Sequence, residues 1–245
     1  MILKHGFMAF LKDNIFQFIE IKIKKIVFLI RYGKSLTLSN TLVRRVKFYN
    51  EDKSNRIIMG NIRMYNSQFI LNGINNCVKL NNSTKNIYGL SIKVYGDNNK
   101  IFIDENACIY GLRIVVRGTS CRVFIGKDFS ENINCMMTCM GKDNFIKIGN
   151  DCMFSENIDI WNTDSHLILD PLGNVLNKNK SITIGDHVWI GKKCSILKGV
   201  NVGNNSVIGM SSVVTSNVDS GSIYVGNPAR KIKGNIIWSR DFAIM

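Results

Sequence analysis

Apolar and polar positions alternate with a period of two in five short segments between residues 76 and 184. The segments end at Leu80, Ile103, Ile125, Ile148 and Ile184, and these ends are separated by 23, 22, 23 and 36 positions. Alternation of this kind predicts short strands with one buried and one exposed face. Because similar strands return at a nearly constant spacing, we predict a fold built from an internal repeat.

A finer period begins at Ile184. An aliphatic residue stands at every sixth position, and a small or aliphatic residue follows four places later: Ile184, Ile190, Ile196, Val202, Ile208 and Val214, followed by Val188, Cys194, Val200, Ser206, Ser212 and Val218. Each hexapeptide predicts one flat strand and one turn, with the aliphatic side chain pointing inward. Three of them close a triangular coil of about 18 residues, which stacks on the next coil at about 4.8 Å.

The longer spacings fit the same coil. Spacings of 22 and 23 residues are one coil with a few extra residues at a corner, and the gap of 36 is either two coils or one coil with a long excursion. We therefore predict an all-β fold, a parallel β-helix over residues 51–225 with a loop at about 162–180. Residues 226–245 are predicted to form a basic turn and tail.

Residues 1–50 follow a different pattern. From residue 1 to about residue 30, apolar residues recur at helical spacing with lysines between them, which predicts a basic amphipathic helical segment. Its longest apolar run, Ile26–Ile30, is far too short to cross a bilayer. We expect the segment to cap the first coil or dock on a neighbouring subunit, with peripheral contact to an anionic membrane as the alternative.

Composition narrows the class of protein. The 245 residues are 45% apolar, which excludes a disordered or collagen-like chain, and the net charge is +14, of which +8 falls in residues 1–50. Two prolines against 20 glycines and 30 asparagines suit the corners of a β-helix. Seven scattered cysteines without a CxxC pair indicate reduced, buried thiols in a cytoplasmic protein and no zinc site. The basic residues form no recognised nucleic-acid-binding motif, so no nucleic acid is expected as a partner.

Three stretches of the repeat carry a family resemblance: Ile184-Gly-Asp-His-Val-Trp-Ile-Gly191, Ile208-Gly-Met-Ser-Ser-Val-Val-Thr215 and Val225-Gly-Asn-Pro-Ala-Arg-Lys-Ile-Lys233. The chain resembles the left-handed β-helix hexapeptide acyltransferases, in particular the branch that O-acetylates sugars of bacterial capsules or lipopolysaccharides. The resemblance implies a left-handed coil, a homotrimer with active sites between subunits, acetyl-CoA as donor and a catalytic histidine on a loop. The chain departs from the family pattern at Met210-Ser211, Ser216 and Asp219-Ser220.

His166 has the surroundings of a catalytic base. It lies in a polar stretch, Asn162-Thr-Asp-Ser-His-Leu-Ile-Leu-Asp170, where the repeat is interrupted. The family's catalytic histidine stands in a matching Thr-Asp-Ser-His context, which implies the general-base role for His166. Asp164 or Asp170 can orient its imidazole, as a backbone carbonyl also can. His5 lies outside the repeat, and His187 stands at an outward corner, where a structural role is expected and substrate contact is the alternative.

Trp189 occupies an outward position of a hexapeptide, where a large ring has no core to fill. The resemblance implies that it contributes to the acetyl-CoA site, with packing at a trimer interface as the alternative. We assign Trp189, His166 and Asp164 to the catalytic site. The remaining candidates for binding acetyl-CoA are backbone amides or side chains near the turns and the cations after the last turn: Gly191, Gly209, Ser211, Thr215, Arg230 and Lys233.

Together these residues predict direct transfer of an acetyl group from acetyl-CoA to a sugar hydroxyl of a bacterial surface polysaccharide. No acyl-enzyme is expected, because Cys194 occupies an inward corner and no other thiol has a paired base. Acetylation of an amino group on a nucleotide sugar is the nearer alternative, and a non-catalytic β-helix that binds a partner is the more distant one. Carbonic anhydrase chemistry needs three zinc-binding histidines in this fold, and only two lie within the repeat.

Overall fold

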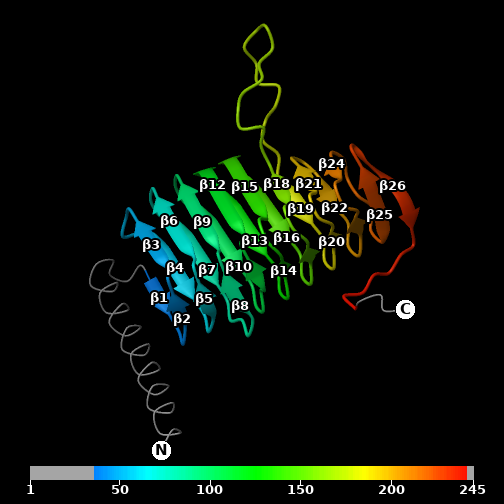
Figure 1. Cartoon of the computed structure of the whole chain (residues 1–245). Coiled ribbons are helices and arrows are strands. Elements are labelled where there is room, and N and C mark those ends of the chain that lie inside the picture. The colour runs from blue at the N-terminus through cyan, green and yellow to red at the C-terminus, as the bar shows by residue number, and fades with distance from the viewer. Residues whose placement is uncertain (1–35, 242–245) are drawn as a thin grey trace, which may run out of the picture.

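The computed structural model describes residues 36–241, which form a parallel β-solenoid with three faces (Figure 1). Face 1 is a sheet of eight strands: β1 (Leu36–Leu38), β4 (Arg56–Met59), β7 (Cys77–Leu80), β10 (Lys100–Ile103), β13 (Arg122–Ile125), β16 (Phe145–Ile148), β19 (Ile182–Ile184) and β22 (Asn201–Val202). Face 3 is a second sheet of eight strands: β3 (Lys47–Asn50), β6 (Gln68–Asn72), β9 (Ser91–Tyr95), β12 (Arg113–Thr119), β15 (Met136–Lys142), β18 (Asp159–Trp161), β21 (Ser195–Leu197) and β24 (Val213–Val214).

Face 2 consists of two sheets joined by an isolated parallel bridge between Cys108 and Ser130. The first sheet contains β2 (Leu42–Arg44), β5 (Arg63–Tyr65), β8 (Asn86–Tyr88) and β11 (Ile109–Tyr110). The second contains β14 (Ser130–Glu131), β17 (Met153–Phe154), β20 (Trp189–Ile190), β23 (Val207–Ile208), β25 (Ser222–Gly226) and β26 (Ala229–Gly234). The last pair, β25 and β26, is antiparallel and ends the solenoid as a hairpin.

The register confirms the rows that the sequence pattern predicts. Leu80, Ile103, Ile125, Ile148 and Ile184 stack in one line down face 1, and each is at most 1% exposed. Since Ile148 pairs directly with Ile184, the gap of 36 residues is one coil with a long excursion. The hexapeptide positions are buried as well, and the inward aliphatic residues from Ile184 to Val214 form one continuous core.

Asparagine serves this solenoid in two ways. Within residues 36–241, nine asparagines adopt a positive φ, at corners such as those of Asn66 and Asn98 and once after β26, a conformation that few other L-residues adopt. Inside the solenoid, Asn55, Asn76 and Asn99 form a buried ladder, in which each side-chain oxygen accepts the backbone N–H of the next coil, at 2.7 Å from Asn76 and 3.0 Å from Asn99. The ladder satisfies polar groups that would otherwise be buried without partners.

The structure corrects the boundary predicted at residue 51. Strands β1 to β3 occupy Leu36–Asn50, so the solenoid begins no later than Leu36. The prediction failed because Arg44, Arg45 and Lys47 are exposed cations of the first coil, and their charge was attributed to a basic helix. The helical segment predicted for residues 1–35 lies outside the described residues. Within 36–241, no helix is long and apolar enough to cross a membrane.

The cysteines and the C-terminal residues complete the fold. All seven cysteines carry free thiols. Five are buried, as predicted, whereas Cys77 and Cys108 are half-buried. The segment predicted as a turn and tail contains strand β26, and residues 235–241 then run back along the side of the solenoid (Figure 1).

Candidate active site

The excursion at residues 162–181 leaves the solenoid at the corner between faces 3 and 1 and stands well clear of it (Figure 1). Asn162, which is fully buried, closes its base. The Asn162 side chain accepts the backbone N–H of Met140 at 2.7 Å and donates to the Met140 carbonyl at 3.0 Å, and its own carbonyl accepts the N–H of Lys180 at 3.1 Å. Both ends of the loop are therefore fixed to the same corner.

Asn177 fastens the two arms of the loop to each other. Its side-chain amide donates to the His166 carbonyl at 2.7 Å and to Oδ2 of Asp164 at 3.0 Å, and its oxygen accepts the N–H of Ile168 at 2.8 Å. At the tip, Oδ1 of Asp170 accepts backbone N–H groups at 2.8 and 2.9 Å and closes the turn. The backbone on both sides of His166 is held by these bonds.

Lys198 ties the loop to the following coil. It stands directly after β21, and because Trp161 pairs with Leu197, it lies beside the point where the loop departs. Its ammonium group donates to Oδ2 of Asp164 and, at 3.1 Å, to the carbonyl of Asn177. The Lys198 ammonium, helped by the Asn177 amide, holds the pKa of the Asp164 carboxyl below its usual range. Asp164 is therefore a charged anchor of the loop.

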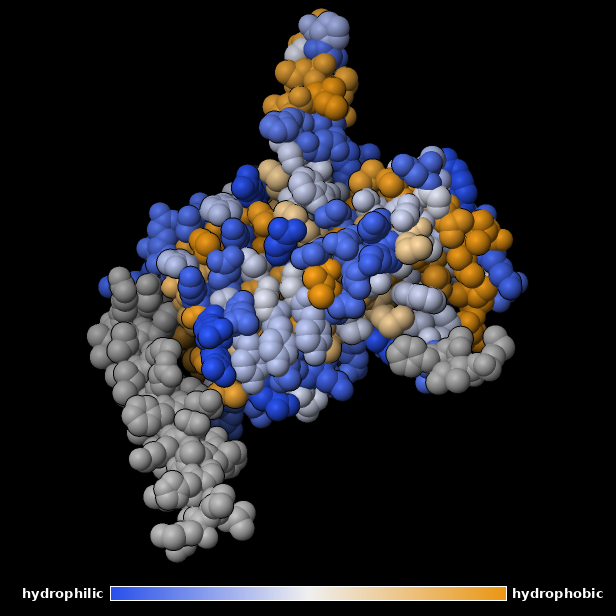
Figure 2. Space-filling view, in the orientation of Figure 1, coloured by the Kyte–Doolittle hydropathy of each residue, from blue (hydrophilic) through white to orange (hydrophobic). Residues whose placement is uncertain are grey.

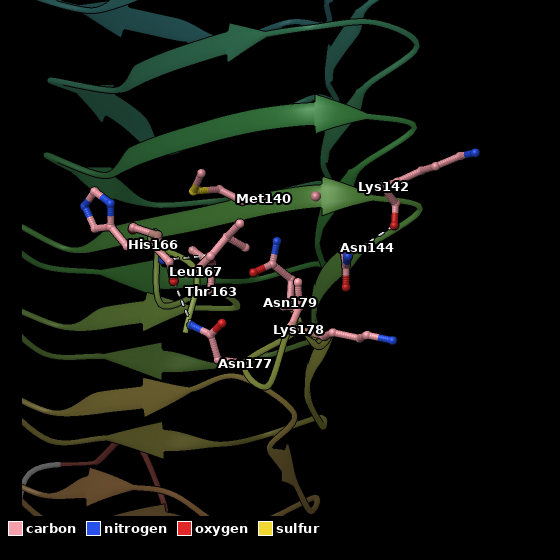
Figure 3. A pocket seen from close by; sticks show the side chains of 12 residues that line it. Met140, Lys142, Asn144, Thr163, His166, Leu167, Asn177, Lys178 and Asn179 are labelled. Atoms are coloured by element: carbon pink, nitrogen blue, oxygen red, sulfur yellow. Dashed lines mark hydrogen bonds between the residues drawn. The ribbon is translucent and has the colours of Figure 1, made fainter. Parts of the chain in front are cut away.

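Beneath the loop is a hollow of about 340 Å³ at the edge of β15. None of the residues that line it is acidic. Besides His166 and several apolar or small residues, the lining consists of two lysines and three asparagines: Lys142, Lys178, Asn144, Asn177 and Asn179. Figure 3 shows the imidazole of His166 at one side, beside Met140, and the ammonium groups of Lys142 and Lys178 at the other. The hollow thus combines an imidazole with ammonium and amide groups.

The His166 side chain is exposed, and within residues 36–241 its ring nitrogens have no hydrogen-bond partner. Neither of the two carboxylates considered for orienting this ring, Asp164 and Asp170, hydrogen-bonds to it in the described part of the chain. Asp164 is engaged by Lys198 and Asn177, and Asp170 by the loop tip. The hydrogen bonds of the loop hold the backbone at His166, and its imidazole is available to bind a ligand.

Sequence reasoning missed Lys198 and Asn177. A signal for Lys198 exists, because aligning the coils across the gap of 36 residues places Leu197 beneath Trp161 and so Lys198 beneath Asn162. Asn177 gives no such signal, since it lies inside the excursion, where the repeat provides no alignment.

Trp189 lies on the opposite side of the same chain. It is on β20, in face 2, whereas the His166 loop leaves from the corner between the other two faces. Its indole is 39% exposed and contacts that of Trp238, with ring centroids 6.0 Å apart. A single chain therefore does not bring Trp189 and His166 together.

The backbone amides of three candidate residues take part in the hydrogen bonding between coils. The N–H groups of Gly191, Gly209 and Ser211 donate at 2.8 Å to the carbonyls of Ile208, Tyr224 and Lys192. Ligand binding near these three residues stays a prediction.

The predicted cations lie on β26. Arg230 and Lys233 are exposed and have no acidic partner within the described part of the chain, whereas Lys231 pairs with Asp219 at 2.9 Å. Thr215 is exposed just after β24. Arg230 and Lys233 are free to meet an anion.

His187 and the thiols do not contribute to this hollow. As expected, His187 has a structural setting, with Nδ1 2.6 Å from Asp151 and its ring against Trp238. Across residues 36–241, no group of three or more His, Cys, Asp or Glu side chains is arranged to hold a metal ion.

Comparison with known proteins finds similarity to hexapeptide-repeat transferases and to polysialic acid O-acetyltransferases. Residues 181–216 match the family model described as bacterial transferase hexapeptide (six repeats). A polysialic acid O-acetyltransferase of Neisseria meningitidis is 33% identical over 157 residues, which cover 56% of this chain and 70% of that protein. A polysialic acid O-acetyltransferase of Escherichia coli O1:K1 is 36% identical over 96 residues, or 39% of this chain, and the match spans only 31% of that relative's length.

Two crystal structures of such proteins share the fold. The polysialic-acid-specific acetyltransferase NeuO superposes with a TM-score of 0.60 at 27% identity, covering 84% of this chain and 90% of its own. The polysialic acid O-acetyltransferase OatWY superposes with a TM-score of 0.63 at 26% identity, covering 82% and 91%. The likeness therefore extends over most of the solenoid and is not limited to the hexapeptide stretch.

Proposed function

This chain belongs to the hexapeptide-repeat acetyltransferases, in the family of the polysialic acid O-acetyltransferases, and from that premise we propose that it transfers an acetyl group from acetyl-CoA to a hydroxyl group of a bacterial surface polysaccharide. The observation that carries the proposal is the position of His166, whose unpaired imidazole stands at a polar hollow on an anchored loop. The free thiols of the chain support a cytoplasmic site of action, where acetyl-CoA is available.

In the proposed reaction, His166 accepts the proton of the sugar hydroxyl as its oxygen attacks the acetyl carbonyl carbon. The C–S bond of the thioester then breaks, and His166 returns the proton to the departing thiolate. A backbone amide other than those of Gly191, Gly209 and Ser211 donates to the oxyanion. Asp164, Lys198 and Asn177 hold the backbone of the loop and so keep the imidazole at the hollow.

The hollow favours an acceptor with negative charge. Lys142 and Lys178 line it, no acidic side chain does, and amide groups are available for hydrogen bonds to sugar hydroxyls. We propose an acidic saccharide, of the kind named for the polysialic acid O-acetyltransferases, as the acceptor.

We propose a left-handed solenoid assembled as a homotrimer, in which the His166 loop of one subunit lies next to Trp189, Arg230 and Lys233 of the neighbouring subunit. Two observations support this assembly. The two halves of the site lie on opposite sides of one chain. In addition, the loop carries a cluster of aliphatic residues that are each 50 to 87% exposed (Figure 2): Leu167, Ile168, Leu169, Leu172 and Leu176. Apolar surface of this kind is normally covered by another protein surface.

Release of free thiol from acetyl-CoA tests the proposed function. The purified protein is offered acetyl-CoA with an acidic oligosaccharide such as oligosialic acid, with a neutral oligosaccharide, or with none. We expect thiol release to require a saccharide and to be fastest with the acidic one. A β-helix that only binds a partner would release no thiol with any of them, and this result would overturn the proposal.

Replacing Lys198 by methionine removes the anchor of the loop at nearly constant volume. We expect kcat to fall by about 10- to 100-fold, since displacement of a catalytic group by about 1 Å has effects of this size. The measurement is steady-state thiol release at saturating acetyl-CoA. Lys127→Met is the matched control, because Lys127 pairs with Glu105 at 3.2 Å, far from the loop. Equal rates for the two variants would show that the anchor does not position His166.

Replacing Arg230 and Lys233 by glutamine tests their contact with phosphate. Each charge-assisted hydrogen bond contributes about 1.5 to 3 kcal/mol, so we expect the dissociation constant of acetyl-CoA to rise at least tenfold in the double variant, with kcat little changed. Titration calorimetry measures the constant. Lys231→Gln is the control, because Asp219 already neutralises that ammonium group. Unchanged affinity in the double variant would assign the phosphates to other residues.

A further inference from the structure

Residues 235–241, here called the C-terminal strap, leave the β25–β26 hairpin and return along the corner between faces 1 and 2 (Figure 1). The N–H of Ile236 donates to the Gly221 carbonyl at 3.1 Å at the start of the strap. One side chain of the strap is buried: Trp238 is 8% exposed, whereas its neighbour Ile237 is 96% exposed. The strap is thus organised around one indole ring.

Trp238 contacts two aromatic residues of the same coil. Its ring stacks on the imidazole of His187, with centroids 4.0 Å apart and planes 13° apart. Two hydrogen bonds reinforce the stack, from Nε1 of Trp238 to the His187 carbonyl at 2.9 Å and between Nε2 of His187 and the Trp238 carbonyl at 3.1 Å. The Trp238 ring also contacts Trp189, at 6.0 Å and 43°.

Arg240 and Asp151 fasten the strap. Oδ1 of Asp151 accepts a hydrogen bond from Nε of Arg240 at 2.7 Å, while Oδ2 lies 2.6 Å from Nδ1 of His187. The Arg240 guanidinium also donates to Ser130 at 2.8 Å and to the Cys152 carbonyl at 3.1 Å. Burial raises the pKa of the Asp151 carboxyl, but the bonds from His187 and Arg240 outweigh this effect and keep the pKa below its usual range. Three successive coils are therefore tied to the strap.

These contacts exceed what closing the solenoid requires. The β25–β26 hairpin covers the end of the core, and the strap instead lies along the side of earlier coils. Chain termini usually fray unless they are tied down. Here the ties converge beside Trp189, an exposed indole on a strand of only two residues, whose Nε1 has no hydrogen-bond partner within residues 36–241.

We propose that Trp238 is a positioning residue for Trp189: the strap holds the Trp189 indole in one orientation, as a wall for the acyl-pantetheine end of acetyl-CoA. The inference rests on the proposed function for the role of Trp189, and on the ring contacts of Trp238 for the mechanism. His187 supplies the ring on which Trp238 stacks, and Asp151 and Arg240 keep the strap in place.

The test compares Trp238→Leu, Trp238→Phe and Ile237→Ala in the full chain. The leucine variant loses the aromatic contact, the phenylalanine variant keeps a ring, and Ile237→Ala changes an exposed strap residue. We expect KM for acetyl-CoA to rise about fivefold in Trp238→Leu, with kcat changed by less than about twofold, and to return to within about twofold of wild type in Trp238→Phe. Ile237→Ala is expected to match wild type.

A spectroscopic readout separates this inference from the proposed function. In protein labelled with fluorotryptophan, the ¹⁹F resonance of Trp189, assigned by Trp189→Phe, is expected to shift and broaden in Trp238→Leu even without acetyl-CoA. If Trp238→Leu does not fold, Arg240→Met releases the strap without touching the core and is expected to give the same change. A Trp189 resonance and a KM that stay unchanged when the strap is released would overturn the inference. A wild-type protein that does not bind acetyl-CoA, but whose Trp189 resonance still responds to Trp238, would contradict the proposed function alone.

Discussion

Replacement of His166 by alanine is expected to lower the rate of acetyl transfer by about 10²- to 10⁴-fold, the range in which a general base contributes. The substitution should leave binding of acetyl-CoA within about twofold of wild type, because His166 lies at the hollow and the candidate phosphate contacts are on β26. Single-turnover thiol release measures the rate, and calorimetry measures the binding.

His166→Gln is the control for shape and hydrogen bonding, since its amide fills the same space and cannot act as a base. We expect it to be as inactive as His166→Ala. Transfer near the wild-type rate in either variant would remove His166 from the mechanism.

The direct mechanism also predicts that no thiol of the enzyme carries the acetyl group. Cys194 is fully buried and donates to the Gly209 carbonyl at 3.1 Å, and burial raises the pKa of its thiol. A buried neutral thiol is a poor nucleophile. The buried position expected for Cys194 from its place in the hexapeptide is confirmed.

Glu131 is expected to make the stability of the solenoid fall as the pH rises. The carboxyl is buried, and burial raises its pKa from the usual 4.5 to about 7, although the Tyr110 N–H donates to Oε1 at 2.6 Å. Within residues 36–241, Oε2 of Glu131 is buried and has no hydrogen-bond partner. The folded protein therefore binds a proton at Glu131 more tightly than the unfolded chain does. The resulting contribution of protonated Glu131 to the free energy of unfolding is fully present below pH 4.5 and is lost as the pH rises to about 7.

Glu131→Gln isolates the effect, because the amide keeps an acceptor for Tyr110 and cannot ionise. We expect the unfolding free energy of the variant, relative to wild type, to increase by about 3 kcal/mol between pH 4.5 and pH 8. Urea unfolding at several pH values measures it. A difference for Glu131→Gln that does not change with pH would contradict the raised pKa.

The solenoid itself could be predicted because its repeat appears in the sequence as a regular order of aliphatic and polar side chains. An aliphatic residue at every sixth position, as at Ile190 and Ile196, has to point inward, and the structure buries each of them. The first coil was missed for a related reason. Its inward residues are few and stand between exposed cations such as Arg44 and Lys47, so charge obscured the alternation.

The candidate site could be predicted only in part. The sequence indicates His166 because it lies where the repeat is interrupted and in a Thr-Asp-Ser-His context that matches the family. Aligning the coils places Lys198 beneath Asn162 at the base of the loop, but it gives no position for groups within the loop, such as Asn177. The Lys198–Asp164 contact joins residues 34 positions apart, and the Arg240–Asp151 contact joins residues 89 positions apart. Contacts between residues so far apart in the sequence depend on how the coils stack and on where the chain returns. No local sequence pattern predicts them.

The most direct test of the central claim is to follow ¹³C-acetyl-CoA and oligosialic acid with the purified protein by NMR. We predict a new ¹³C-acetyl ester resonance on a sugar hydroxyl, formed by the wild-type chain and not by His166→Ala. Absence of any acetylated saccharide, or an acetyl ester formed equally well by His166→Ala, would contradict the account.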